Sequence, residues 1–124
     1  MANFPHVHME LSRSGGDPLV RQLDKAQVLE ATVQQLMKDL GSEAIIVPAP
    51  GPEAFEALRG QVLPILETRH AESTHALQVV LYRVDLHERA ARDAMDLGGV
   101  RELAGRVVLR CLQKVITRMA FRPH

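Results

Sequence analysis

Carboxylate and imidazole side chains are the groups in this sequence that could bind a metal ion. Glu67 and His70 have the E-x-x-H spacing, which places both side chains on one face of a helix, as in di-iron helical bundles. Such bundles need two of these motifs and two further carboxylates, whereas this chain has one motif. Paired zinc-binding cysteines and the H-E-x-x-H motif are absent. We therefore predict no cofactor and no metal site, with Glu67 and His70 as the candidate pair if a metal binds.

Cys111 is the single cysteine, so it cannot form a disulfide within the chain. It shares a helix face with Val107 and Val115, which predicts a buried small hydrophobe. A nucleophilic cysteine needs a nearby base, and no histidine lies close to it in sequence. The two Gly-Gly pairs, 15–16 and 98–99, do not match phosphate-binding loops, and G-x-S-x-G is absent. No local motif indicates an enzyme, although catalytic groups also assemble from distant positions.

Basic side chains recur at every fourth position of the last predicted helix. This basic ladder consists of Arg106, Arg110, Lys114, Arg118 and Arg122. Residues four apart are neighbours on a helix surface, so the ladder is a continuous positive row beside a continuous apolar row. Three interpretations follow. The ladder can be the solvated flank of a core helix, a contact for acidic protein surface, or a site for a polyanion such as nucleic acid.

The charge of the chain is divided unevenly along its length. From residue 101 onward there are six basic residues and one acidic residue, whereas residues 1–100 contain nine basic and fourteen acidic residues. The sum is neutral, which is atypical of nucleic-acid-binding domains. No aromatic residue interleaves with the ladder before Phe121, which disfavours stacking on single-stranded bases.

The segment 81–88, LYRVDLHE, mixes polar groups into an apolar run. In a structural interpretation, which we favour, Tyr82 anchors one end of the core and Asp85 with Glu88 caps the following helix. In a functional interpretation, the same residues and Arg83 line a groove.

The bulk composition is that of a globular protein of 124 residues, long enough to bury its own core. With three Phe, one Tyr and no Trp, aliphatic side chains must build that core. No apolar run approaches the roughly 18 residues that span a bilayer, and the N-terminus lacks the features of a secretion signal. We therefore expect a cytoplasmic protein that does not enter membranes.

The first half of the chain is predicted to contain an arm, a helix and an extended segment. Residues 1–17 form the arm, and residues 18–122 form a helical domain. A helix over 18–40 begins after the capping residue Asp17 and stops at Gly41. Residues 44–48 are β-branched and extended, and they can pair with the arm as minor β structure.

The second half is predicted to be helical with several breaks. A helix begins at Pro52 and either ends near Leu63 or kinks, because Pro64 removes a helical hydrogen bond. Residues 76–84 favour a helix, and a strand there would give an α+β fold instead. A small helix capped by Asp85 ends at Gly98 and Gly99, and the ladder helix follows over 100–121.

The expected fold is mainly α, a compact bundle of four to five helices. A four-residue repeat drifts around a 3.6-residue helix, so the C-terminal helix should cross its neighbours obliquely. We expect a non-enzymatic protein-interaction or adaptor module that self-associates and presents the basic ladder and the turn at 48–52. Its partner is a protein with acidic surface or a second copy. Polyanion binding through the ladder is the alternative, and a metal-binding helical protein using Glu67 and His70 is the third.

Overall fold

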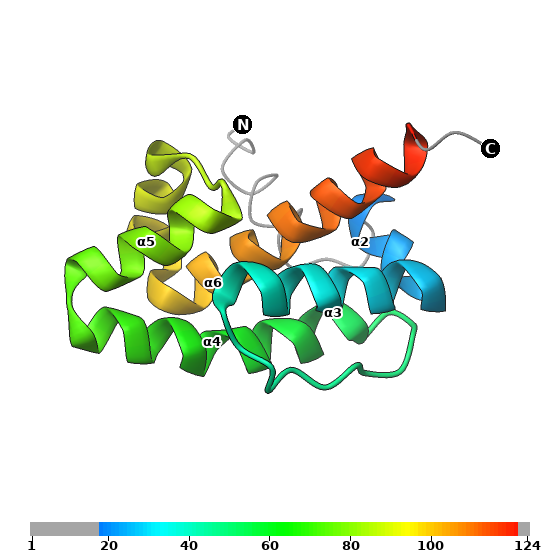
Figure 1. The fold of residues 1–124 in the computed structure, drawn as a ribbon, viewed down its shortest axis with the longest axis horizontal. Helices are drawn as coiled ribbons and strands as arrows, with labels where there is room; N and C mark the ends of the chain where they lie inside the picture. The colour runs from blue at the N-terminus through cyan, green and yellow to red at the C-terminus, as the bar shows by residue number, and fades with distance from the viewer. Residues whose placement is uncertain (1–17, 122–124) are drawn as a thin grey trace, which may run out of the picture.

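The computed structural model describes residues 18–121, and these residues form a mainly α bundle, as predicted (Figure 1). Five α-helices and one 3-10 helix follow one another along the chain: α2 (Pro18–Arg21), η1 (Gln22–Asp24), α3 (Ala26–Leu40), α4 (Ala54–Glu72), α5 (Thr74–Val84) and α6 (Glu88–Ala120). There is no strand between residues 18 and 121. The predicted arm and the last ladder residue, Arg122, lie outside the described residues, so the pairing of the arm with residues 44–48 stays a prediction.

The helix predicted over 18–40 is not continuous. The backbone of Lys25 is extended, with φ −92° and ψ 121°, and it separates η1 from α3. This break changes the phase of the apolar face, so that Leu23 and Leu29 are both fully buried while Ala26 is exposed. The prediction of one continuous helix over 18–40 was wrong. No proline or glycine marks the break, so no local signal in the sequence indicated it. The predicted stop is confirmed, since Gly41 adopts the left-handed conformation at the end of α3.

A side chain of α4 holds the segment between α3 and α4. The amide of Ile46 donates a hydrogen bond of 2.8 Å to Oε1 of Gln61, and Nε2 of Gln61 donates one of 2.8 Å to the Ile46 carbonyl. Ile45, next to this pair of hydrogen bonds, is buried, whereas Ile46 is 74 % exposed. A single glutamine thus satisfies the backbone of an extended residue at the surface.

Helix α4 continues through Pro64 to Glu72, so of the two predicted alternatives, an end near Leu63 or a kink, the end was wrong. Pro64 cannot donate to the carbonyl of Gly60, four residues earlier. Both residues are exposed, so that carbonyl lies on the solvent side of the helix, where water can replace the lost bond.

Residues 76–84 belong to helix α5, so the helical prediction is confirmed and the strand alternative is wrong. Ser73 caps its start, with Oγ accepting a 2.9 Å hydrogen bond from the Ala76 amide. Asp85 was predicted to begin the next helix, but it ends α5 in the left-handed conformation, which aspartate tolerates better than most residues. His87 caps α6 instead, because its Nδ1 accepts from the Arg89 amide at 3.0 Å.

Helix α6 is broken at the predicted glycines. Gly98 and Gly99 have non-helical dihedral angles, and Gly99 has φ 71° and ψ −155°, a conformation reserved for glycine. The break separates residues 88–97 from residues 100–120. The second part runs obliquely past α3 and α4, as expected from the slanting apolar row (Figure 1).

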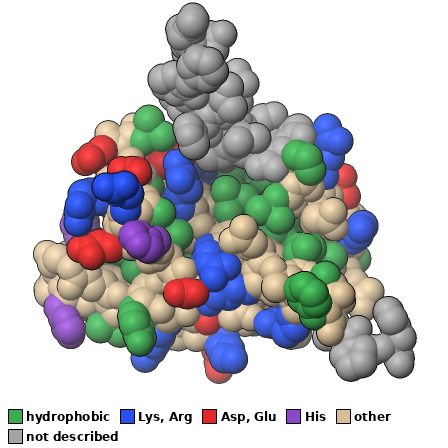
Figure 2. All heavy atoms as spheres, turned by 90° about the horizontal axis from the view of Figure 1, so that it is seen from above, with side chains coloured by type: hydrophobic (Ala, Val, Ile, Leu, Met, Phe, Trp, Pro, Cys, Tyr) green, Lys and Arg blue, Asp and Glu red, His purple; other side chains and the backbone are tan. Residues whose placement is uncertain are grey.

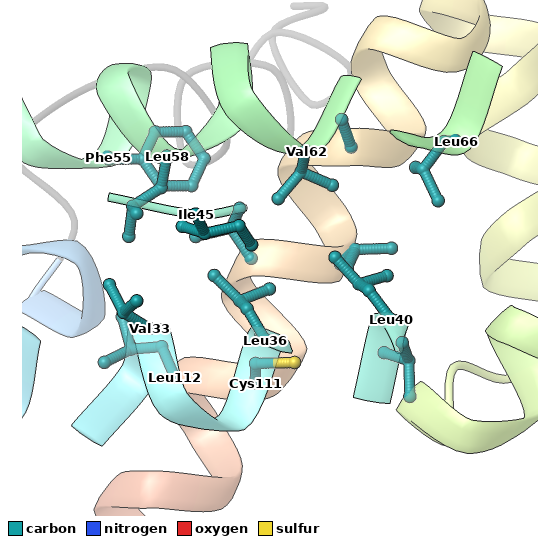
Figure 3. Packing of buried hydrophobic residues seen from close by; sticks show 14 of the residues in the cluster. Val33, Leu36, Leu40, Ile45, Phe55, Leu58, Val62, Leu66, Cys111 and Leu112 are labelled. Atoms are coloured by element: carbon teal, nitrogen blue, oxygen red, sulfur yellow. The ribbon is translucent and has the colours of Figure 1, made fainter. Parts of the chain in front are cut away.

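Aliphatic side chains of α3, α4 and α6 build the core (Figure 3). Leu36 of α3, Val62 of α4 and Leu112 of α6 are fully buried. Cys111 lies in the same cluster, so its predicted burial is confirmed. Within residues 18–121 no helix combines the length and the apolar character needed to cross a membrane.

Candidate functional site

The basic ladder binds to other parts of the same chain. Arg106 Nε donates to Oε2 of Glu102 at 3.2 Å, one helical turn away. Arg110 contacts Asp85 twice, through Nη2 to the carboxylate at 2.9 Å and through Nε to the backbone carbonyl at 3.0 Å. The second contact satisfies a carbonyl at the end of α5, so Arg110 ties α6 to the C-terminus of its neighbour.

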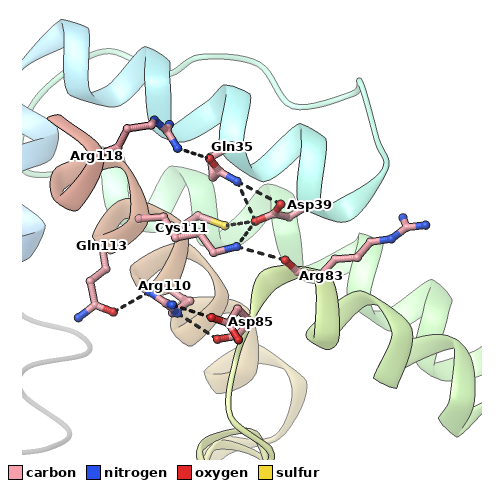
Figure 4. Close-up of polar contacts among 9 residues, drawn as sticks. Gln35, Asp39, Arg83, Asp85, Arg110, Cys111, Gln113 and Arg118 are labelled. Atoms are coloured by element: carbon pink, nitrogen blue, oxygen red, sulfur yellow. Dashed lines mark hydrogen bonds and ion pairs between the residues drawn. The ribbon is translucent and has the colours of Figure 1, made fainter. Parts of the chain in front are cut away.

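The next ladder residues contact α3 (Figure 4). Lys114 Nζ lies 2.7 Å from Oδ2 of Asp39 and also donates to the Arg83 carbonyl at 3.1 Å. Arg118 Nη1 donates to Oε1 of Gln35 at 3.0 Å. Gln35 in turn donates from Nε2 to both oxygens of Asp39, each at 3.1 Å. Asp39 is thus the acceptor at the centre of a polar cluster between α3 and α6.

These contacts give the ladder a definite structural role. Its first three side chains are 20 to 28 % exposed, and acids of the same chain compensate their charge. Use of the ladder as a contact for another molecule is a separate matter and stays a prediction. Charged side chains of both signs are interspersed on the face drawn in Figure 2, which displays no continuous basic patch.

Cys111 belongs to the same polar cluster. Its Sγ donates a hydrogen bond of 3.5 Å to Oδ2 of Asp39. Burial, reinforced by the negative charge of Asp39, raises the pKa of the Cys111 thiol far above its ordinary value, and the positive charge of Lys114 opposes this only in part. The thiol therefore keeps its proton, and the side chain is unsuited to nucleophilic chemistry.

A buried arginine on α4 escaped the sequence analysis. Arg59 is 3 % exposed and lies over the ring of Phe55, 5.1 Å from its centroid. It forms an ion pair with Glu56 on its own helix, and its Nη1 lies 3.9 Å from Oε1 of Glu102 on α6. Gly105 of α6 leaves the space that this arginine occupies, because a Cβ there would lie 3.1 Å from Nη1 of Arg59.

The candidate metal pair does not gain a third ligand. Glu67 and His70 are both exposed on α4. The described residues contain no group of three or more His, Cys, Asp or Glu side chains that could hold a metal ion. His70 instead lies at the rim of a groove.

The groove lies between α5 and the first part of α6, and we call it the α5–α6 groove. It has a volume of about 620 Å³. Aliphatic side chains form its floor and walls: Leu77, Leu81, Leu86, Ala91, Met95 and Leu103. Polar side chains form the rest of its lining: His70, Thr74, Gln78, Glu88 and Arg92. An apolar concavity with a polar rim is typical of a site that binds another molecule.

Tyr82 stands beside this groove with 86 % of its surface exposed. The prediction that it anchors the core was therefore wrong, because its ring turns away from the bundle. The alternative for segment 81–88 fits the structure in part. Tyr82 and Glu88 do line the groove, whereas Asp85 turns to Arg110.

Comparison with models of protein families, with curated protein sequences and with solved structures finds no match to this chain.

Proposed function

We propose that this chain is a non-enzymatic protein-interaction module, in the manner of a small adaptor, and that the α5–α6 groove is its docking surface. The observation that carries the proposal is the pairing of an apolar groove with a nearly fully exposed tyrosine, Tyr82. Tyrosine contributes strongly at interfaces because its ring is large and rigid and its hydroxyl tolerates water.

The form of the groove favours an amphipathic helix of a partner protein. Two helices wall the groove, and aliphatic side chains such as Leu81 and Met95 face its interior. A partner helix can place apolar side chains at positions i, i+3 or i+4, and i+7 into such a groove. At the rim of the groove, Nη2 of Arg92 lies 3.2 Å from Oε2 of Glu88. This ion pair presents a positive and a negative charge to the polar side of that helix.

The C-terminal helix takes part in this proposal through its first half, which forms one wall of the groove. The ladder in its second half supports the groove indirectly, because Arg110 fixes the end of α5. Self-association and a cytoplasmic location, expected from the sequence, remain part of the proposal.

Selection of short random peptides against the immobilised protein tests the docking surface. We expect enriched peptides to share large apolar residues at helical spacing, and to bind a Tyr82→Glu variant more than about tenfold more weakly. The matched control is Phe121→Glu, because Phe121 is 82 % exposed and lies outside the groove. Peptides without an apolar pattern, or equal binding to both variants, would contradict the proposal.

A further inference from the structure

We infer that residues 88–97 of α6 are a movable wall of the α5–α6 groove, which undocks from the bundle while the other helices stay folded. In this view, which rests on the proposed function, the movement regulates how a partner helix enters the groove. We call residues 88–97 the movable wall. Three features of the segment carry the inference: the little apolar surface it buries, the lack of polar ties, and a break in the helical backbone at each of its ends.

The movable wall buries little apolar surface. Its buried side chains are those of Ala91 and Ala94, 8 % and 0 % exposed, and Met95 is partly buried. An alanine side chain is a single methyl group, and the gain from burial scales with the apolar area removed from water. Residues 100–120 of the same helix bury branched side chains such as Leu112 completely. The attraction that holds the movable wall on the bundle is therefore weak by comparison.

Polar side chains fasten the two walls of the groove unequally. Arg110 binds both the carboxylate and the backbone carbonyl of Asp85, which holds the end of α5 against the second half of α6. Within residues 18–121, the only hydrogen bond or ion pair between side chains of the movable wall and any other side chain joins Arg92 to Glu88, and both belong to the wall itself. Helix α5 is thus the fixed wall, and residues 88–97 are the wall that can leave.

Breaks in the helical backbone lie on both sides of the movable wall. Before it, Asp85 ends α5 in the left-handed conformation, and α6 begins only at Glu88. After it, Gly98 and Gly99 interrupt α6, and Gly99 has φ 71° and ψ −155°, which glycine adopts readily and other residues avoid. Residues at the ends of elements absorb the dihedral changes of hinge movements, so both breaks are suited to be hinges.

The groove and the length of the segment favour opening as a local event. A volume of about 620 Å³ lies between α5 and the movable wall, whereas protein interiors contain few voids. Once undocked, residues 88–97 form a helix shorter than the roughly 12 residues below which helices are marginal without tertiary contacts. Undocking should therefore expose the backbone amides of the wall. A partner helix bound in the groove gives the wall new contacts and should suppress this opening.

Hydrogen exchange followed by mass spectrometry tests the movement in the full chain. After correction for intrinsic rates, we expect amides of residues 91–97 to exchange at least about a hundredfold faster than those of residues 107–115. Dilute urea should accelerate exchange in 107–115, which requires global unfolding, and leave exchange in 91–97 nearly unchanged. Equal protection of the two segments, with an equal response to urea, would overturn the movable wall.

Two variants separate local opening from global unfolding. Ala94→Gly removes a buried methyl group and lowers the helix propensity of the wall, so exchange in 91–97 should rise at least about threefold. Val115→Ala removes buried methyl groups from the other half of α6. It should accelerate exchange in 107–115 more than about fivefold and leave 91–97 unchanged. If Val115→Ala accelerates both segments by the same factor, the wall opens only when the whole bundle unfolds, which overturns the inference.

A peptide from the random-peptide selection connects the movement to the groove. At saturation it should slow exchange in residues 91–97 more than about tenfold, because the wall closes on it. A peptide that needs Tyr82 for binding but leaves this exchange unchanged would overturn the role of the wall and leave the docking surface intact. Fast local exchange in 91–97 without any enriched peptide would uphold the movement and count against the docking function.

Discussion

Lys114 Nζ lies 2.7 Å from Oδ2 of Asp39, and the two residues are 75 positions apart in the sequence. Asp39 is 6 % exposed, and its carboxylate also accepts hydrogen bonds from Gln35 and the Cys111 thiol. One acid therefore joins α3 to α6 inside an otherwise apolar region. Because a buried carboxylate needs its partners, this contact makes the position of the ladder helix dependent on Asp39.

Replacing Asp39 by alanine should lower the free energy of unfolding by about 3 kcal/mol, because Lys114 and Gln35 lose their common acceptor. Urea unfolding measures the change. Glu30→Ala is the control, since Glu30 is exposed on the same helix and its loss should change the stability by no more than about 0.5 kcal/mol. Equal losses in the two variants would show that the cluster contributes no stability.

The raised pKa of Cys111 makes the stability depend on pH in the alkaline range. The folded thiol keeps its proton, whereas the unfolded thiol loses it above about pH 8.5. This contribution is therefore fully present below pH 8.5 and is lost as the pH rises further, at about 1.4 kcal/mol per pH unit. Between pH 8.5 and pH 10, the parent should lose about 1.5 kcal/mol more than Cys111→Ala does, because the unfolded thiol is already half ionised at pH 8.5.

Urea unfolding under reducing conditions at the two pH values gives that difference directly. Parallel losses in parent and variant would mean that the thiol is equally ionised in the folded and unfolded states.

Two helical glycines should respond in opposite ways to alanine. A Cβ at Gly60 has no neighbour within 4 Å, so Gly60→Ala should gain up to about 1 kcal/mol from helix propensity. A Cβ at Gly105 would lie 3.1 Å from Nη1 of Arg59, which is buried and held by Glu56 and Glu102. Gly105→Ala should therefore gain nothing or lose stability. Thermal unfolding compares them, and an equal rise in Tm for both would refute the close packing at Gly105.

Reversing two ladder charges should lower the stability of the fold even when no ligand is present. The Arg110→Glu, Lys114→Glu variant places acids beside Asp85 and Asp39, so we expect a loss of more than about 3 kcal/mol in free energy of unfolding. Lys38→Glu, an exposed change on α3, should be nearly neutral. A variant as stable as the parent would show that the ladder is free to serve an external partner.

DNA binding by the parent chain tests the polyanion alternative. The parent should bind duplex DNA no more tightly at low salt than a neutral protein of this size, because its four described ladder residues, Arg106, Arg110, Lys114 and Arg118, already bond within the chain. Binding that falls steeply as salt rises would instead favour nucleic acid as the ligand.

Local signals in the sequence predicted most of the elements. The spacing of Leu77, Val80 and Val84 favoured a helix over a strand at α5, and Gly41 and the Gly98-Gly99 pair marked the ends of helices. The break at Lys25 has no such signal. Leu23 before the break and Leu29 after it are both fully buried, so both segments pack on the core.

The candidate site was less accessible from the sequence. That Lys114 pairs with Asp39 depends on how α6 crosses α3, and no local pattern encodes a contact over 75 residues. The groove likewise exists only because α5 packs against the first half of α6. Segment 81–88 did draw attention to Tyr82, but periodicity alone could not tell whether its ring faced the core or the solvent.

The central claim is that the α5–α6 groove binds another protein chain, with self-association as part of that proposal, and the most direct test is the mass in solution. Light scattering after size exclusion should give twice the 13.8 kDa of one chain at low salt and high protein concentration. The mass should fall toward 13.8 kDa as the protein is diluted, because the association of two copies depends on concentration. A mass of 13.8 kDa at every concentration and at both salts would contradict association through this surface between copies of the chain.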